Sequence, residues 1–195
     1  MSPGTTLRQC PANLHVLGAG DQTDGLYFIL SGRVKIYVSE GAGREFVLNE
    51  QGPGECFGEM VLDDGPRSAS VLTLEPSRFL VIPRSDVKEF LRRHPDFAMQ
   101  VIRQLIGHVR RLTEKTRALS LEGVYERLVR YLDECAEEEK GVRIVRGPLT
   151  HAELGRHIGA SREMVSRVMK DLSTGGYLRS EKGRLVLLRE FPRNW

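Results

Sequence analysis

Charged and hydroxyl side chains recur at short intervals between residues 161 and 170, which read SREMVSRVMK. In a helix of this sequence the apolar side chains share one face, so the polar ones are left for the opposite face. Arg can form two parallel hydrogen bonds with a guanine edge, and Glu can accept one from cytosine. The stretch therefore predicts a helix whose outer face reads bases in a DNA major groove. The predicted DNA contacts on it are Arg162, Glu163, Ser166, Arg167 and Lys170, and its predicted core face is Val165, Val168, Met169 and Leu172.

The residues immediately before this helix predict a shorter helix and a tight turn. Thr150 and Glu153 have the spacing of a capping box, in which each side chain bonds to an amide at the helix start. Leu154 and Ile158 lie four positions apart and share one helix face. A glycine then permits the turn, and Ser161 is a good N-cap for the next helix. Together they predict a helix-turn-helix, with Thr150 and Ser161 also lying against the DNA.

Residues 175–187 predict a small antiparallel hairpin after the second helix. A Gly-Gly pair closes that helix, and two β-rich runs flank a turn at Lys182-Gly183. Basic residues of the hairpin stand where a wing would meet phosphate groups. The combination predicts a winged helix-turn-helix. The alternative is an ordinary helical hairpin with a solvated charged face.

Residues 161–167 closely resemble the start of the recognition helix in the Crp-Fnr family of bacterial transcription regulators, which has the pattern SRExxxR. The resemblance implies that Arg162, Glu163 and Arg167 read bases. It also implies half-sites similar to TGTGA, arranged as a palindrome on double-stranded DNA and bound by a homodimer. We expect no enzyme activity, because the sequence contains no Ser-His-Asp, Cys-His, metal-ligand or P-loop pattern.

The first 93 residues predict a domain of short antiparallel strands. Between residues 14 and 83, β-rich runs alternate with glycine-containing turns, which is typical of an antiparallel barrel or jelly roll. The pattern GxxxDxLYxIxxGxV, from Gly20 to Val34, resembles the β-roll of cyclic-nucleotide-binding domains. The predicted strands cover residues 26–30, 33–38, 46–48, 69–74 and 78–82.

The segment from Gly54 to Ala69 resembles the phosphate-binding part of that β-roll. A phosphate group binds well to a helix N-terminus and to the fork of an Arg side chain. A carboxylate repels phosphate, so the resemblance assigns Glu59 to the ribose. It implies a site for cyclic AMP or another cyclic nucleotide, and no cofactor is required. The residues assigned to this ligand are Gly58, Glu59, Arg67, Ser68, Ala69 and Thr113.

Two departures from the family pattern leave alternatives open. Only eight positions separate Glu59 from Arg67, so the phosphate loop is shorter than in relatives that bind cyclic AMP. In the family, two adjacent hydroxyl residues contact adenine. The matching positions here are Leu112 and Thr113, so one of the two hydroxyl groups is missing. One alternative is a regulator that binds DNA without an effector, its empty pocket held by an ion pair between Glu59 and Arg67. The other is a cyclic-nucleotide regulatory protein that does not bind DNA.

A long helix is predicted from about Asp96 to Ser120. Its apolar residues recur at alternating steps of four and three, which is a heptad repeat. Val101 and Ile106 are expected to widen this stripe toward the β-roll. The helix should pack on its own domain and on the same helix of a second copy, and packing on its own domain alone is the alternative. The heptad positions are Ala98, Ile102, Leu105, Val109, Leu112, Thr116 and Leu119.

The segment after this helix carries three weaker predictions. Gly123 is expected in a hinge, because glycine absorbs backbone rotation most easily. Residues 124–136 predict a helix, and residues 137–141 predict a charged, solvated loop. In activating relatives a loop near here contacts RNA polymerase, so the polymerase is an expected partner without an assigned surface. The core face predicted for the helix is Leu128, Tyr131, Leu132 and Cys135.

Charge and composition agree with an α+β protein that joins a sensor to a DNA-binding domain. The first 93 residues carry 10 Lys and Arg against 12 Asp and Glu, whereas the chain from Pro148 onward carries 9 against 5. A basic end suits contacts with phosphate. The expected domains are a β-roll over residues 1–93, a dimerisation helix over 94–120 and a winged helix-turn-helix over 121–195.

The sequence also predicts where the protein works. No apolar run is long enough to cross a membrane, and the N-terminus lacks the apolar region of an export signal. Three scattered cysteines do not make a disulfide framework. A cytoplasmic protein is therefore expected, with no membrane partner and no metal site. Cys56 is interpreted as a small buried residue, with a redox-active thiol as the alternative.

Overall fold

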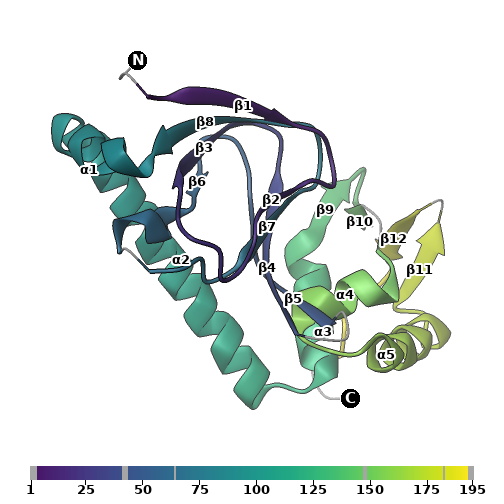
Figure 1. Cartoon of the computed structure of the whole chain (residues 1–195). Helices are drawn as coiled ribbons and strands as arrows, with labels where there is room; N and C mark the ends of the chain where they lie inside the picture. Colours follow the sequence, from purple (N-terminus) through teal and green to yellow (C-terminus); the bar gives the residue numbers. More distant parts are fainter. Residues whose placement is uncertain (1–3, 41–43, 64, 147–148, 182, 193–195) are drawn as a thin grey trace. The chain divides into compact units, whose positions relative to one another are not determined.

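The computed structural model describes residues 4–40, 44–63, 65–146, 149–181 and 183–192. The chain divides into two compact units, residues 1–112 and residues 113–195 (Figure 1). Helix α2 (Pro95–Leu121) contributes residues to both units. Each unit has a hydrophobic core of its own.

The first unit contains the predicted roll of antiparallel strands. One sheet has the strand order β1-β8-β3-β6 and the other β2-β7-β4-β5. The five predicted runs lie in β3, β4, β5, β7 and β8. The sequence analysis missed β1, β2 and β6, and runs as short as the three residues of β2 and the two of β6 carry no periodic pattern. The strands are β1 (Thr6–Cys10), β2 (His15–Leu17), β3 (Gly25–Ser31), β4 (Val34–Glu40), β5 (Arg44–Gln51), β6 (Cys56–Phe57), β7 (Ser70–Thr73) and β8 (Ser77–Pro83).

Aromatic rings hold β3, β6 and β8 together inside the roll. Tyr27 stacks on Phe57 with ring centroids 5.0 Å apart, and Phe57 meets Phe79 edge-on at 5.2 Å. Both geometries are favoured for aromatic pairs. The three rings are almost completely buried. They therefore fix β6, the short strand that leads directly to Gly58 and the one-turn 3-10 helix η1 (Glu59–Leu62).

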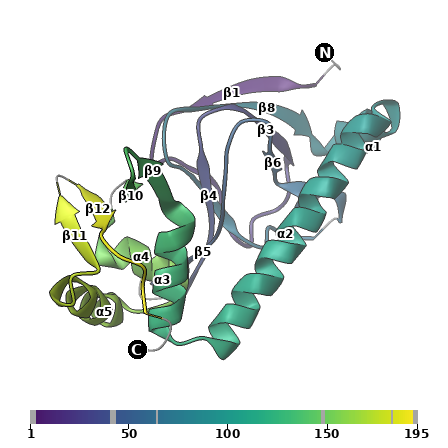
Figure 2. The same cartoon turned by 180° about the vertical axis from the view of Figure 1, so that it is seen from behind.

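Helix α1 (Arg84–Arg93) and the first part of α2 pack on the other side of the sheet that contains β3 (Figure 2). Val101 is buried there and Leu105 packs beside it, as predicted for Val101. The prediction for Ile106 is wrong, because its side chain is 48% exposed. In an α-helix Leu105 points only about 40° away from Val101, whereas Ile106 points about 140° away.

The second unit packs three helices against a four-stranded sheet with the order β11-β12-β10-β9. Leu128 and Leu132 are completely buried and Tyr131 is partly buried, as predicted. Cys135 is exposed instead, because it is the last residue of α3, and Tyr125 joins the core from the first turn. The elements are α3 (Val124–Cys135), β9 (Ala136–Glu139), β10 (Val142–Arg146), α4 (His151–Ile158), α5 (Arg162–Thr174), β11 (Leu178–Glu181) and β12 (Arg184–Leu187).

The charged segment at residues 137–141 is not the loop that the sequence predicted. Strand β9 pairs with β10 through a turn at Lys140 and Gly141, whose φ values are 52° and 77°. Positive φ at both positions is typical of a tight hairpin turn. Arg146 lies 3.8 Å from Glu137 and 2.7 Å from Glu139, so the acidic strand is balanced within its own sheet. A strand reading AEEE has no alternating pattern, which is why the sequence did not reveal it.

Candidate functional site

The first helix of the helix-turn-helix begins and ends as predicted. Thr150 Oγ1 accepts a hydrogen bond from Glu153 N at 3.2 Å, and Thr150 N donates to Glu153 Oε2 at 3.1 Å. This reciprocal pair is the capping box, and a cap of this kind is worth about 1 kcal/mol. Leu154 and Ile158 are buried, and Gly159 ends α4 in the left-handed conformation with φ of 66°.

The turn between α4 and α5 depends on a residue that the sequence analysis missed. Ala160 N donates to Gly155 O at 3.0 Å, which brings the backbone of the turn onto α4. A Cβ on Gly155 would lie 2.5 Å from Ala160 O, so only glycine fits. Ser161 Oγ then accepts from Met164 N at 3.2 Å and caps α5, as predicted. A glycine inside the helical pattern was the available signal.

Helix α5 is buried on one face and exposed on the other. Val165, Met169 and Leu172 are buried and Val168 is partly buried, which confirms the predicted core face. On the opposite side, the polar residues of the recognition pattern gather around one open hollow of about 450 Å³. The predicted DNA contacts on α5 are thus brought together. The residues that line the hollow are Arg162, Glu163, Ser166, Arg167 and Lys170.

Glu163 is held in its ionised form at the start of α5. Hydrogen bonding to its own backbone amide, and then to Ser161, keeps the pKa of this carboxyl below its usual value. An ionised carboxylate only accepts hydrogen bonds. Glu163 therefore presents hydrogen-bond acceptors beside the hydrogen-bond donors of Arg162. This pair is complementary to a base-pair edge that offers both a donor and an acceptor.

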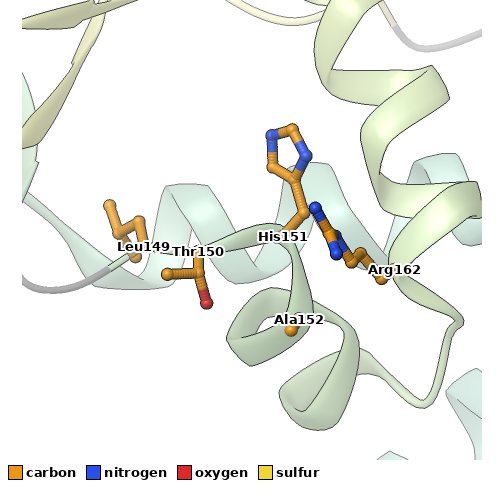
Figure 3. A pocket seen from close by; sticks show the side chains of 5 residues that line it. All are labelled: Leu149, Thr150, His151, Ala152 and Arg162. Atoms are coloured by element: carbon orange, nitrogen blue, oxygen red, sulfur yellow. The ribbon is translucent and has the colours of Figure 1, made fainter.

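A second hollow, of about 470 Å³, is bordered by Arg162 and by residues 149–152. Figure 3 shows the side chains of His151 and Arg162 on its lining, one from the start of α4 and one from the start of α5. Arg162 therefore takes part in both hollows. The sequence analysis did not assign His151, and its place directly after the cap Thr150 was the signal that could have singled it out.

Strands β11 and β12 form the predicted wing hairpin, and the turn residue Lys182 lies outside the described residues. Arg179 pairs with Glu181 at 3.0 Å, and Arg184 lies 3.7 Å from Glu139 of β9. These two wing arginines thus already have acidic neighbours. Exposed pairs of this kind are weak, so a phosphate group can compete for either guanidinium.

In the first unit, five residues assigned from the resemblance line one small cavity. Its volume is about 40 Å³. Such a space holds roughly three waters, which is comparable to a phosphate group and smaller than a nucleotide. Thr113, the sixth predicted contact, belongs to the second unit and stays a prediction. The cavity is lined by Gly58, Glu59, Arg67, Ser68 and Ala69 and by Leu17, Ile36, Phe57, Met60 and Val71.

Arg67 is almost completely buried beside this cavity, with 4% of its surface exposed. Its Nη1 donates to Gly58 O at 2.7 Å, and its Nη2 donates to Asp24 Oδ1 at 2.7 Å and to Gly25 O at 2.9 Å. The ion pair considered from the sequence, between Glu59 and Arg67, is wrong for the described residues, since the carboxylate that pairs with Arg67 is Asp24. The guanidinium thereby ties η1 to the start of β3.

Asp24, the ion-pair partner of Arg67, was not assigned by the sequence analysis. Partial burial alone would raise its pKa, but hydrogen bonds from Tyr27 and Arg67 outweigh it and hold the pKa below the usual value. Tyr27 donates to Asp24 Oδ2 at 2.6 Å, and burial together with this bond raises the pKa of Tyr27 to about 12. Asp24 therefore stays ionised opposite Arg67.

The residues present fit an anionic oxygen of a cyclic phosphate. Among the described residues, the buried Nε of Arg67 has no hydrogen-bond partner, so this donor is left for a ligand. Gly58 has φ of 85°, and a Cβ there would lie 2.7 Å from Arg67 Nη1 and 2.9 Å from Gly25 O. The glycine thus keeps the cradle open around the guanidinium.

Cys56, next to this pocket, is a buried thiol, and burial followed by the charges of Glu59 and Glu55 raises its pKa to about 12. A thiol in this state is unreactive, which favours the interpretation as a small core residue over a redox sensor. Cys10 is buried too.

Helix α2 exposes much of its predicted heptad seam. Ile102, Val109, Leu112 and Leu119 are 45%, 63%, 41% and 42% exposed. Ala98 and Leu105 are partly buried instead, and Leu105 packs into the core against α1 and β3. Large exposed apolar side chains in one helical register are typical of a surface that another helix covers.

A β-roll, a long helix and a winged helix-turn-helix on one chain define a DNA-binding transcription regulator with a sensor domain. Residues 7–94 match the cyclic nucleotide-binding domain, and residues 126–191 match the Crp-like helix-turn-helix domain. The chain belongs to the Crp-Fnr family. The regulators to which it is similar are not enzymes.

Named relatives and a solved structure are similar to this chain over nearly its whole length. The chain is 32% identical over 188 residues to the CRP-like cAMP-activated global transcriptional regulator of Mycobacterium tuberculosis, with 94% of this chain and 84% of that protein covered. It is 34% identical over 180 residues to the cyclic AMP receptor protein of Thermus thermophilus, with 90% and 81% covered. The structure of the c-di-GMP responsive global regulator CLP of Xanthomonas campestris has a TM-score of 0.84 at 28% identity, with 94% of both chains covered.

Two further features bear on partners. Among the described helices, none combines the length and apolar character that crossing a bilayer requires. Within the same ranges, His, Cys, Asp and Glu side chains nowhere gather in threes as a metal ion would need.

Proposed function

We propose that the protein binds palindromic DNA as a homodimer and reads half-sites similar to TGTGA with α5. The observation that carries the proposal is the face of α5 on which Arg162, Glu163 and Arg167 border one hollow while the opposite face is buried. Arg162 and Arg167 bond guanine edges, and Glu163 accepts from cytosine. The remaining contacts, which position the helix, come from Thr150, Ser161, Ser166 and Lys170.

Dimerisation follows from the exposed seam of α2. Two recognition helices must lie about 34 Å apart, one turn of DNA, to reach both half-sites. Pairing of the α2 seams from two copies would cover Ile102, Val109 and Leu112 and fix that spacing. We assign the dimerisation helix to residues 94–120, between the sensor at 1–93 and the DNA-binding domain at 121–195.

The effector of this regulator is a cyclic nucleotide held beside η1. Arg67 Nε and the cradle at Gly58 and Ser68 would hold the cyclic phosphate, and Glu59 the ribose. Ala69 lines the same cavity, and Thr113 would supply a contact to the base. Relatives described as cAMP-activated support cyclic AMP, and one described as c-di-GMP responsive makes a second nucleotide the alternative effector.

A second candidate function is DNA binding without an effector. It is favoured by one observation, that Arg67 already bonds to Asp24, Gly58 and Gly25 through its two Nη atoms. Such a pocket is stable without phosphate. Either regulator works in the cytoplasm, where DNA and RNA polymerase are found.

One experiment separates these functions. Operator affinity is measured by fluorescence anisotropy on a palindromic TGTGA duplex and on a scrambled duplex, without a nucleotide and with cyclic AMP or c-di-GMP, beside sedimentation of the free protein. We expect a dimer, preference for the palindrome, and tighter binding with cyclic AMP. Equal binding without a nucleotide and with either cyclic AMP or c-di-GMP supports the effector-independent regulator. Equal binding to both duplexes contradicts sequence-specific recognition.

A further inference from the structure

Among the described strands, β6 lies at the edge of its sheet, so one side of its backbone has no neighbouring strand. The side chain of Gln104, on α2, occupies that side. Its Oε1 accepts from Cys56 N at 3.1 Å and from Cys56 Sγ at 3.3 Å, and its Nε2 donates to Cys56 O at 2.6 Å. The amide of one glutamine thus bonds to the strand as the backbone of a further strand would.

The strand held in this way leads into the ligand cradle. Cys56 is followed directly by Phe57, Gly58 and Glu59, all of which line the cavity. Gly58 O is bonded to Arg67 as well, so the same short stretch is tied at one end to Arg67 and at the other to Gln104. A ligand that accepts hydrogen bonds from Arg67 therefore affects the same backbone segment to which Gln104 is hydrogen-bonded.

The contact also differs in kind from the rest of the packing between α2 and the β-roll. Val101 and Leu105 make apolar contacts, which are non-directional and tolerate sliding. A side chain that both donates hydrogen bonds to one residue and accepts them from it does not tolerate sliding, because hydrogen bonds weaken steeply with misalignment. One turn further, His108 Nε2 lies 2.9 Å from the side-chain nitrogen of Gln51, so a second polar contact holds the same helix face.

We propose that Gln104 is the residue through which a ligand bound beside η1 moves α2. Movement of Gly58 displaces Cys56, and the two-way bond makes α2 follow. Helix α2 runs unbroken to Leu121 and includes residues of the DNA-binding unit, so this movement changes how the recognition helices are presented. The inference rests on the proposed cyclic-nucleotide effector and adds the positioning residue that couples it to DNA binding.

The test uses the full chain with Gln104→Met, which keeps the volume of the side chain and removes its hydrogen bonds. Gln100→Met, the same change one turn earlier at an exposed position, is the matched control. Calorimetry measures cyclic AMP binding, and anisotropy measures operator affinity with and without cyclic AMP. Effectors of this kind usually change affinity by about 5- to 150-fold. We expect Gln104→Met to bind cyclic AMP like the wild type and to lose that enhancement, while Gln100→Met keeps both.

The outcomes separate this inference from the proposed function. A wild-type chain that neither binds nor responds to cyclic AMP overturns both. A responding wild type with an equally responsive Gln104→Met overturns the inference alone, as does a Gln104→Met variant that no longer binds cyclic AMP, because Gln104 would then act in the pocket itself.

A measurement on the wild type covers the case in which Gln104→Met does not fold. The side-chain amide signals of Gln104 are followed by NMR during a titration with cyclic AMP, with those of Gln100 as the internal reference. Coupling requires the Gln104 signals to shift while those of Gln100 stay in place. Unchanged Gln104 signals at saturating cyclic AMP contradict the role.

Discussion

The two predicted sites hold their arginines in opposite ways. On α5, Arg162 and Arg167 are exposed, and the fold depends on buried residues behind them such as Val165. In the β-roll, Arg67 is buried and bonds to Asp24 and to two backbone carbonyls. Arginines of the first kind are available to a partner without any role in the fold. Arg67 has both roles, so its loss should damage the sensor itself.

Replacement of Arg67 should have the largest effect. Arg67→Met removes the Arg67 donors from two carbonyl oxygens and from Asp24 Oδ1, and Tyr27 remains as the donor to Asp24 Oδ2, so we expect the sensor to lose about 3 kcal/mol of stability. Thermal melting of the full chain, resolved by transition, measures this. Arg33→Met, at a side chain 58% exposed, should stay within about 0.5 kcal/mol of the wild type. An unchanged melting curve for Arg67→Met would remove the contrast between the two sites.

The DNA-binding unit also has a position that does not tolerate substitution, and there the constraint comes from the backbone. Gly155→Ala places a Cβ 2.5 Å from Ala160 O, so the turn must open, and we expect a loss of about 2 kcal/mol together with weaker operator binding. The matched change Gly107→Ala meets nothing closer than 3.5 Å in the middle of α2. It should stabilise the protein by about 0.5–1 kcal/mol, because alanine is the better helix former. Melting of both variants checks the opposite signs.

The helix-turn-helix could be predicted almost residue by residue because its signals are local. Thr150, Glu153 and Ser161 act within three positions of their partners. In the pocket, the sequence predicted which residues gather but missed the partner of Arg67, since Asp24 lies 43 positions away. No local rule reports such a pairing.

The other two errors have different causes. Ile106 was assigned to the β-roll by its apolar character, whereas the helix angle from Val101 places it on the exposed side. Strand β9 was missed because its acidic residues are stabilised by Arg146 and Arg184, which belong to other strands. Local helix geometry therefore contradicts the first assignment, whereas contacts with other strands decide the second.

Substitutions on α5 should change specificity and leave stability alone. Arg162→Ala should lose about 1–3 kcal/mol of discrimination at one G·C pair, whereas Lys170→Ala should weaken binding to all sequences alike. The free energy of unfolding of both variants should stay within about 0.5 kcal/mol of the wild-type value, since both side chains are exposed. Anisotropy against single-base operator variants distinguishes them. Equal losses on every variant for Arg162→Ala would refute its assignment as a base reader.

The smallest expected effect is a pH dependence of the sensor that originates on α2. Burial, and then the charge of Arg111, lower the pKa of His108, while Glu59 and Glu55 oppose this more weakly. The folded protein therefore favours neutral His108. Its contribution to stability is fully present above the unfolded pKa of about 6.5 and is lost as pH falls through the lower folded pKa. Melting between pH 7.5 and pH 5 should fall more steeply for the wild type than for His108→Gln, which keeps a polar contact to Gln51 without a titrating ring. Parallel curves would show that protonation of this ring does not affect how α2 is held.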